Sequence, residues 1–272
     1  MKSIENMITD IILSGYTGSF KLTDEQIQDL WIQYCIPKVN FGRYISTRQI
    51  EAIDLAFYKF AVRCFNDGLN IAFKGGCLIR HILRNVGHTD LRYTKDIDFD
   101  LCEYTYLKLI EYYTTLVRIG KLRDDMKCNA VLLDGPYDCD LKIVSNFRLD
   151  TIIIYECPIG NFIGVRLEDI LADKITSLSS KLITARVKDI IDVHKFITNK
   201  DILKEIQIPL LRIFIAERKI GDFKIIKEKP KELIKALSYF TNKPDDVIKT
   251  CLMFINGVLG TNSIIWNGRV WL

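Results

Sequence analysis

The chain has 272 residues, 49% of them hydrophobic and 26% charged, an ordinary globular composition that suggests one large domain or two modest ones. The formal net charge is only +4, and no two of the eight cysteines have a CxxC spacing, which argues against a zinc cluster. No stretch approaches the roughly 18 apolar residues of a membrane span, and the N-terminus lacks the apolar run of a signal peptide, so we expect a reduced, cytoplasmic protein with no membrane partner.

Helical patterns dominate the first 70 residues. Residues 4–14 predict a short amphipathic helix, and residues 23–36 predict a second one, with Thr23 as its cap and acidic residues in its first turn. A longer helix is predicted over residues 46–67, where an Asp-Gly turn ends it. The apolar run at residues 69–73 then predicts a buried strand.

The next stretch, residues 74–100 (KGGCLIRHILRNVGHTDLRYTKDIDFD), predicts a glycine turn, a short helix and a strand that carries acids. Glycines at a helix start can cradle phosphate, because backbone N–H groups point outward there. Asp96 and Asp98 lie two residues apart, so on a strand both face the same side and can share Mg²⁺ ions. Taken singly, each feature also has a plain structural explanation, a steric glycine turn or solvated acids. Together they predict nucleotide chemistry.

Residues 104–122 predict a helix whose tyrosines (Tyr104, Tyr106, Tyr112 and Tyr113) we expect to pack in the core and at its rim rather than to stack on bases. Three strands should follow, at residues 129–135, 137–145 and 150–159.

Phosphoryl transfer with two metal ions calls for a third carboxylate near the Asp96–Asp98 pair. Asp138 and Asp140 share parity on the strand predicted at residues 137–145, so both can face one side. Asp140 is the candidate because it lies further into the strand. The alternative is a pair of solvated acids at a hairpin end.

From Leu167 onward the pattern is mainly helical. Two helices are predicted within residues 167–198, and further helices at 201–217, 230–240 and 243–259, with a terminal strand or hairpin at 262–272. The predicted fold class is therefore α/β (α+β). A mixed sheet with flanking helices and N-terminal helices occupies residues 1–163, and a mainly α-helical domain occupies residues 164–272.

Charged residues in the helical half suggest two readings. Lys174 could reach a triphosphate, or its stem could cover apolar surface while its ammonium stays in water. Asp189 and Asp192 are three residues apart and lie on one helix side, but Arg186 and Asp189 have the same spacing and could simply form an ion pair. Residues 161–272 carry 19 Lys and Arg against 13 Asp and Glu. That excess is compatible with a nucleic-acid partner or with solvated basic helix faces.

Four motifs, KGGCLIRH, KDIDFDL, LEDILADKITSL and RVKDIIDVH, stand in this order between Lys74 and His194. In this they resemble the AbiEii/AbiGii-type toxins of the nucleotidyltransferase superfamily, which act in abortive infection and toxin–antitoxin systems. The chain departs from the family pattern at Cys77, where relatives often have a hydroxyl residue, and at Val144, where some relatives carry the third acid.

The resemblance implies a nucleotidyltransferase-like fold and a role for each motif residue. Gly75 and Gly76 would hold the nucleotide phosphates, Lys174 would contact the triphosphate, and Asp189 would complete the site from the helical half. Asp96 and Asp98 would bind Mg²⁺, with Asp140 as the third carboxylate.

The function that follows is Mg²⁺-dependent transfer of a nucleoside monophosphate from an NTP to an acceptor. The family suggests RNA such as a tRNA 3′ end, a toxin role and a cognate antitoxin as partner. Three alternatives stay open: a nucleotidyltransferase that modifies a small molecule or a protein, an inactive copy that binds a nucleotide or an antitoxin, and a purely structural protein.

Overall fold

The computed structural model describes residues 38–39, 50–133, 135, 137–144, 151–179, 186–218, 230–260 and 265–271. The helices predicted at residues 4–14 and 23–36 lie outside these ranges. The chain divides into two compact units, the first formed by residues 1–85 and 89–165 and the second by residues 86–88 and 166–272. No helix in the described ranges is both long enough and apolar enough to cross a membrane.

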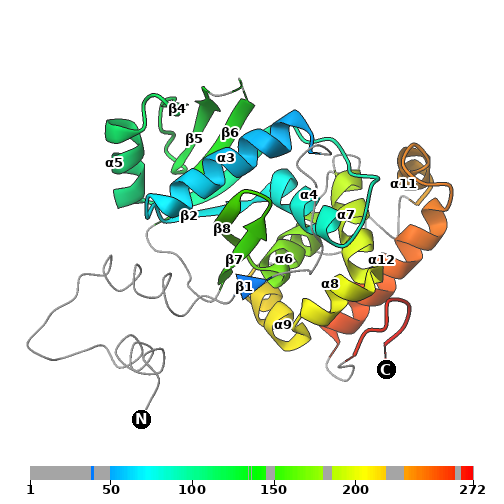
Figure 1. The fold of residues 1–272 in the computed structure, drawn as a ribbon. Coiled ribbons are helices and arrows are strands. Elements are labelled where there is room, and N and C mark those ends of the chain that lie inside the picture. Colours follow the sequence, from blue (N-terminus) through cyan, green and yellow to red (C-terminus); the bar gives the residue numbers. More distant parts are fainter. Residues whose placement is uncertain are drawn as a thin grey trace, which may run out of the picture. The chain divides into compact units, whose positions relative to one another are not determined.

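The first unit is built on an eight-stranded mixed sheet with the strand order β1-β7-β8-β2-β3-β6-β5-β4 (Figure 1). The strands are β1 (Lys38–Val39), β2 (Ile71–Lys74), β3 (Asp96–Cys102), β4 (Val117–Ile119), β5 (Lys127–Leu132), β6 (Tyr137–Val144), β7 (Ile152–Cys157) and β8 (Gly160–Val165). The pairs β1–β7, β2–β8 and β3–β6 are parallel, and the other pairs are antiparallel. Together with its helices, this sheet confirms the predicted α/β class.

Aromatic packing holds helix α3 (Ala52–Asn66) against the sheet. The ring of Phe57 meets those of Phe73 and Phe162 edge-on, and Phe60 contacts Phe73 and Phe99, with ring centroids 5.1–5.8 Å apart. Each such ring removes 150–250 Å² from water, about 4–6 kcal/mol at 25 cal/mol per Å² before ordering costs. These residues therefore form the centre of the first unit's core.

Strands β3 and β6 alternate between a buried and an open face. On β3, Ile97, Phe99 and Leu101 are fully buried, whereas Asp96, Asp98 and Asp100 between them are partly exposed. On β6 the same alternation leaves Asp138, Asp140 and Lys142 exposed. Because paired strands keep their side chains in phase, the carboxylates of both strands lie on the same face of the sheet.

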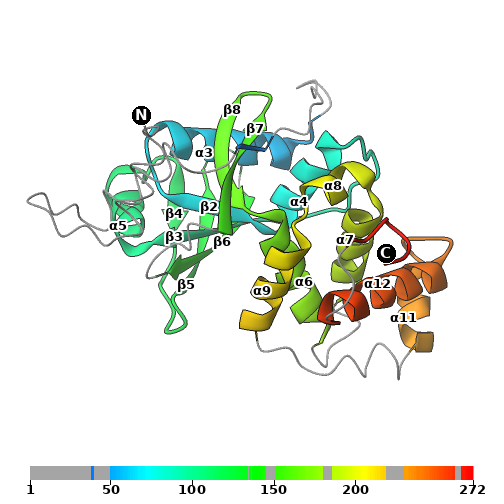
Figure 2. The ribbon, with the colours of Figure 1, turned by 90° about the horizontal axis from the view of Figure 1, so that it is seen from below.

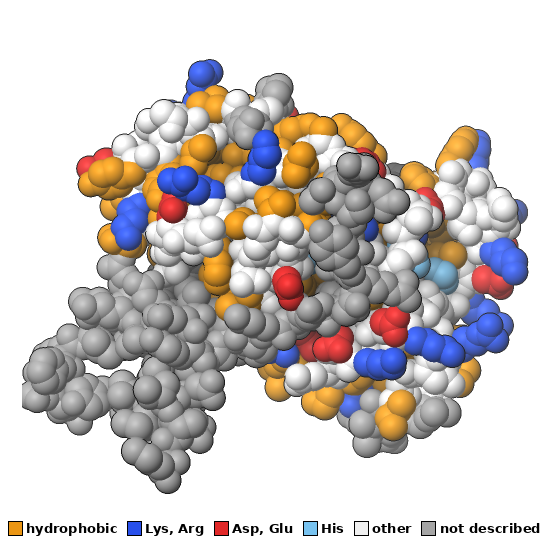
Figure 3. All heavy atoms as spheres, viewed as in Figure 1, with side chains coloured by type: hydrophobic (Ala, Val, Ile, Leu, Met, Phe, Trp, Pro, Cys, Tyr) orange, Lys and Arg blue, Asp and Glu red, His pale blue; other side chains and the backbone are white. Residues whose placement is uncertain are grey.

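Two further helices complete the described part of the first unit. Helix α4 (Gly75–Asn85) follows β2 directly, and α5 (Glu103–Tyr112) follows β3. Figure 3 shows hydrophobic side chains at the surface over α5, where Tyr104 and Tyr112 are exposed. The prediction that these two tyrosines pack in the core or at its rim is therefore wrong, because α5 buries only Thr105 and Leu109.

The helix predicted over residues 104–122 is also too long. It ends at Tyr112, and Val117–Ile119 form β4, paired with β5 at the sheet edge. Thr114, Thr115 and Val117 are β-branched, which disfavours a helix and favours a strand once an edge is available. The strands β1 and β8 were not predicted at all.

The second unit is helical in the ranges described, as predicted (Figure 2). Its helices are α6 (Leu167–Leu178), α7 (Val187–Thr198), α8 (Lys200–Glu205), α9 (Ile208–Glu217), α11 (Pro230–Leu237) and α12 (Pro244–Leu259). Asn199 caps α8, because its side-chain oxygen accepts from the backbone N–H groups of Asp201 and Ile202. Trp266 and Trp271 form an isolated antiparallel bridge in the predicted terminal hairpin, and the Trp266 indole donates to the carbonyl of Ile197.

Candidate active site

The glycine pair stands where α4 begins and where β3 comes closest to it. Gly75 has a φ of +66°, and a Cβ at this position would lie 1.8 Å from Oδ2 of Asp98. A Cβ at Gly76 would lie 2.2 Å from Oγ1 of Thr94. Only glycine permits both approaches, so the pair brings the first turn of α4 against the acidic strand.

Asp98 is the most perturbed carboxylate of the site. Burial raises its pKa to about 6, and the negative charges of Asp96 and Asp140 act in the same direction. The backbone N–H of Gly76 donates a hydrogen bond to it, and this bond and the Lys74 ammonium lower the pKa in part. The positive end of α4 thus already holds one carboxylate of the pair that the sequence singled out.

The strand register places the predicted carboxylates side by side. Asp96 lies opposite Asp138, and Asp98 lies opposite Asp140, across the parallel pair β3–β6. Asp100, on the same face, pairs instead with a cation, since its Oδ1 lies 2.5 Å from Nζ of Lys74. Within the described part of the chain, the other four carboxylates of this face form no ion pair.

This donor set fits a hard divalent cation in its chemistry. Carboxylate oxygens are the ligands that Mg²⁺ prefers in proteins. Burial, together with repulsion from Asp96 and Asp140, raises the pKa of Asp98, and a bound cation would oppose this shift. No three His, Cys, Asp or Glu side chains among the described residues converge into a metal-binding group. The aspartates are thus neighbours in register whose oxygens do not meet at one point.

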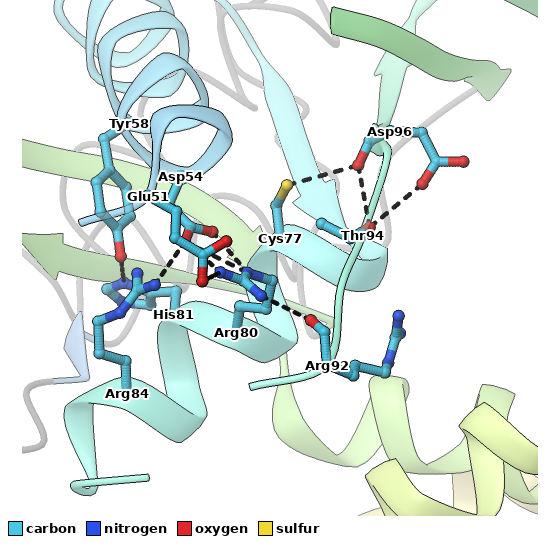
Figure 4. Close-up of polar contacts among 10 residues, drawn as sticks. All are labelled: Glu51, Asp54, Tyr58, Cys77, Arg80, His81, Arg84, Arg92, Thr94 and Asp96. Carbon is cyan, nitrogen blue, oxygen red and sulfur yellow. Dashed lines mark hydrogen bonds and ion pairs between the residues drawn. The ribbon is translucent and has the colours of Figure 1, made fainter. Parts of the chain in front are cut away.

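Thr94 is a site residue that the sequence analysis missed. It is buried, and its Oγ1 lies 3.3 Å from Oδ1 and 3.4 Å from the carbonyl oxygen of Asp96 (Figure 4). Sγ of Cys77 lies 3.5 Å from the same carbonyl oxygen. Burial raises the pKa of the Cys77 thiol, which disfavours the thiolate that a cysteine nucleophile requires.

Lys174 and Asp189 lie together in the second unit. The Lys174 ammonium is 2.5 Å from Oδ1 of Asp189 and 3.3 Å from Oδ2 of Asp192, and both aspartates are buried. Nη1 of Arg186 lies 3.4 Å from the second oxygen of Asp189, so the ion pair suggested by their spacing is present. These contacts join α6 to α7.

The seven predicted site residues thus fall into two groups. Gly75, Gly76, Asp96, Asp98 and Asp140 come together in the first unit, and Lys174 and Asp189 come together in the second.

No protein-family model and no curated protein matches the chain, so the AbiEii/AbiGii resemblance stays a prediction. Solved structures with a similar fold include nucleotidyltransferase-like proteins. One is an antigenic nucleotidyltransferase-like protein from Paracoccidioides brasiliensis, with 15% identity and a TM-score of 0.40 over 70% of this chain and 94% of that one.

A second similar structure is the nucleotidyltransferase toxin MenT4 from Mycobacterium tuberculosis, with 14% identity and a TM-score of 0.42 over 79% of this chain and 70% of that one. A third is a putative nucleotidyltransferase from H. pylori, with 12% identity and a TM-score of 0.42 over 79% of this chain and 96% of that one. At TM-scores below 0.5 these likenesses assign neither a family nor an activity to this chain.

Proposed function

We propose that this protein is a Mg²⁺-dependent nucleotidyltransferase that transfers a nucleoside monophosphate from an NTP to an acceptor. The observation that carries the proposal is the row of carboxylates on the open face of β3 and β6, directly beside the glycine turn that begins α4. Like charges at this spacing disfavour the ionised form of the half-buried Asp98, and a bound cation would favour it. Its place next to a helix N-terminus suits a substrate that carries both phosphate and metal.

In this proposal each residue has a separate task. Asp96, Asp98 and Asp140 would hold Mg²⁺, and the first turn of α4, where Gly75 and Gly76 let Asp98 and Thr94 approach, would lie beside the phosphate groups. When bound, Mg²⁺ stabilises the charge on the attacking and leaving oxygens. A carboxylate of this row accepts the proton of the acceptor hydroxyl. The hydroxyl oxygen forms a bond to the α-phosphorus, while the bond from that phosphorus to the bridging oxygen breaks and pyrophosphate leaves.

Lys174 and Asp189 enter the proposal through the motif resemblance. Lys174 would contact the triphosphate and Asp189 would complete the site. The Lys174 ammonium is already held by two carboxylates in the second unit. A nucleotide contact by Lys174 would therefore add to, or exchange with, these ion pairs.

The proposed acceptor is RNA, with a tRNA 3′ end as the family's example. Two charge features support a polyanionic acceptor. Residues 161–272 carry a basic excess, and on the first unit Lys127 and Lys142 lie directly opposite each other on the same sheet face as the aspartates. The toxin role and a cognate antitoxin are proposed from the resemblance.

The test is incubation with labelled NTPs, Mg²⁺ and total tRNA. We expect label to join RNA, and the signal to vanish with Asp98→Ala. Label on protein or on a small molecule would replace the RNA acceptor with one of the other two classes. Nucleotide binding without any transfer, unchanged by Asp98→Ala, would overturn the enzyme and leave an inactive binding copy.

A further inference from the structure

The first unit contains a cluster of charges formed by Asp54, Arg80, Arg84 and Glu51 and called here the Arg80 cluster (Figure 4); its centre is buried, whereas Glu51 is exposed. Asp54 and Arg80 are each only 1% exposed. The Arg80 guanidinium grips both oxygens of Asp54, with Nε 2.9 Å from Oδ1 and Nη2 2.7 Å from Oδ2. Arg80 Nη2 also lies 2.6 Å from Glu51, and Arg84 Nη2 lies 2.5 Å from Asp54.

The Arg80 cluster balances two acids with two arginines. Such a buried ion group is weak evidence for stability, because the cost of removing its charges from water is of the same order as their attraction, and apolar residues of similar size often serve as well. What a planar, bidentate guanidinium supplies is fixed geometry. We therefore expect the main effect of the Arg80 cluster to be on the position of the segments it contacts, rather than on the free energy of unfolding.

One nitrogen of the Arg80 guanidinium contacts a residue outside the cluster. Its Nη1 donates to the carbonyl oxygen of Arg92 at 2.6 Å, in the segment that connects α4 to β3. Two residues later, Thr94 packs against Gly76 and its hydroxyl reaches the Asp96 carboxylate. A continuous set of contacts thus runs from Asp54 on α3, through Arg80 on α4, to Asp96 (Figure 4).

Asp96 depends on this support more than Asp98 does. The pairing of β2 with β3 reaches only as far as Asp98, opposite Lys74. Asp96, the first residue of β3, has a register partner on the β6 side only. Apart from the contact of Cys77 Sγ with its carbonyl oxygen, its place relative to α4 is therefore determined by the segment that precedes it.

We infer that Arg80 and Thr94 are positioning residues, which place the Asp96 carboxylate beside Asp98 for a divalent cation. This inference rests on the proposed function, because it assumes that the two aspartates share a metal ion. Neither residue touches the reacting atoms. Arg80 acts through the Arg92 carbonyl, and Thr94 acts through its hydroxyl.

The experiment measures Mn²⁺ affinity of the full chain by titration calorimetry, without nucleotide or turnover. Arg80→Gln should weaken Mn²⁺ binding about 10–100-fold, the effect typical of outer-shell partners of a metal site. The matched control is Arg84→Gln, which removes an ion pair to the same Asp54 oxygen but no contact to Arg92. It should change the affinity less than about threefold, while thermal unfolding shows a comparable loss of stability.

A second pair of variants covers the case in which Arg80→Gln does not fold. Thr94→Val keeps the packing against Gly76 but removes the hydroxyl, whereas Thr94→Ser keeps the hydroxyl. The valine variant should weaken Mn²⁺ binding, and the serine variant should restore it. Amide hydrogen exchange at residues 93–96 should quicken in Arg80→Gln and not in Arg84→Gln.

The outcomes separate this inference from the proposed function. If the wild type binds no Mn²⁺, or binds it equally well after Asp98→Ala, the proposed metal site is wrong. If the wild type binds through Asp98 but Arg80→Gln and Arg84→Gln behave alike, or Thr94→Val matches the wild type, the positioning role is wrong.

Discussion

At the scale of single residues, the contact with Asp98 explains why glycine stands at position 75. The sequence predicted the glycines as a cradle for phosphate, yet in the structure a carboxylate lies against Gly75 and accepts from the N–H of Gly76. That contact joins residues more than 20 positions apart, so no local pattern predicts it. The alternation of side chains along a strand predicted that Asp96 and Asp98 face the same side. It could not identify Thr94, whose role depends on the approach of α4 to the segment before β3.

Gly75→Ala tests this contact. The positive φ alone costs a non-glycine residue about 1–2 kcal/mol, and the new methyl would also displace Asp98. We expect a loss of unfolding free energy beyond that conformational cost, together with weakened Mn²⁺ binding, measured by urea unfolding and calorimetry. Gly68→Ala is the control, since Gly68 has the same φ of +66° but nothing within 4 Å of the added Cβ. Equal losses in both variants would contradict the contact.

His81 makes stability depend on pH. Its ring nitrogens lie 3.0 Å from the Tyr58 hydroxyl and 3.0 Å from the Asn85 amide nitrogen. Burial, aided by the positive charge of Arg84, lowers its pKa to about 3. The unfolded chain takes up this proton near pH 6.5 and the native protein does not, so the His81 contribution to stability is complete above pH 6.5 and is lost as the pH falls below it.

The expected size is about 1.4 kcal/mol per pH unit for one proton. Between pH 7.5 and pH 5.5, the wild type should lose about 1.4 kcal/mol more unfolding free energy than His81→Gln. Urea unfolding at the two pH values measures this, and the titration of other groups cancels between the proteins. Parallel pH dependence of the two would mean that His81 is accessible to protons in the native state.

At the scale of elements, most long periodic segments were predicted well and short ones were not. The exceptions are the helix predicted at residues 104–122, which ends at Tyr112, and the helix predicted at residues 201–217, which is two helices, α8 and α9. Helices α3, α4, α6, α7 and α12 each have a start signal or an amphipathic repeat that local sequence shows. Whether the segments of β4 and β8 form strands depends on the neighbouring strands with which they pair. The local sequence of Val117–Ile119 is compatible with a helix, but pairing with β5 makes it a strand. Gly160–Val165 contains glycines that, without knowledge of its partner strands, predict a loop.

Lys174 tests whether an ion pair between elements also serves the substrate. Lys174→Met leaves buried Asp189 and Asp192 without this cation, so we expect a loss of about 3 kcal/mol in unfolding free energy. Adding Asp192→Asn should recover part of this loss. If Lys174 also contacts the nucleotide, the KM for NTP stays raised in the double variant. A normal KM there would reduce Lys174 to a structural residue.

The cross-strand pair Lys127 and Lys142 tests the proposed polyanionic acceptor. Like charges directly opposite each other destabilise a sheet, and a bound phosphate backbone would relieve this. Changing both residues to Glu should weaken RNA binding and reduce the slope of log K against log[salt] by about 1.4, for two contacts to a single strand. The control is the double charge reversal of Lys59 and Lys108, on helices α3 and α5 of the first unit. Equal effects would indicate only a loss of net positive charge.

For the whole molecule, the sequence identified the residues of the candidate site but not the contacts that support them. The motifs identified the carboxylates and the glycine turn, and the register of β3 with β6 then placed Asp140 opposite Asp98. The Arg80 cluster has no sequence signal, because Asp54 and Arg80 are 26 residues apart and resemble ordinary surface charges of two amphipathic helices.

Growth of expressing cells tests the proposed toxin role of the whole protein. Induced expression of the wild type should arrest growth, and Asp98→Asn should relieve the arrest at equal protein level, because the proposed transfer needs this carboxylate. Asp124→Asn, in an exposed loop, should leave the arrest intact. Arrest by both variants would mean that toxicity does not arise from the proposed chemistry.

The contact between Gly75 and Asp98 also constrains how this sequence can diverge. A side chain at position 75 is excluded chiefly by the Asp98 carboxylate, 1.8 Å from where its Cβ would lie. Lineages that keep Asp98 should therefore keep Gly75, whatever nucleotide they use. Lineages that lose the acid should be free to replace the glycine by residues that tolerate a left-handed backbone, such as Asn. The two positions should thus change together.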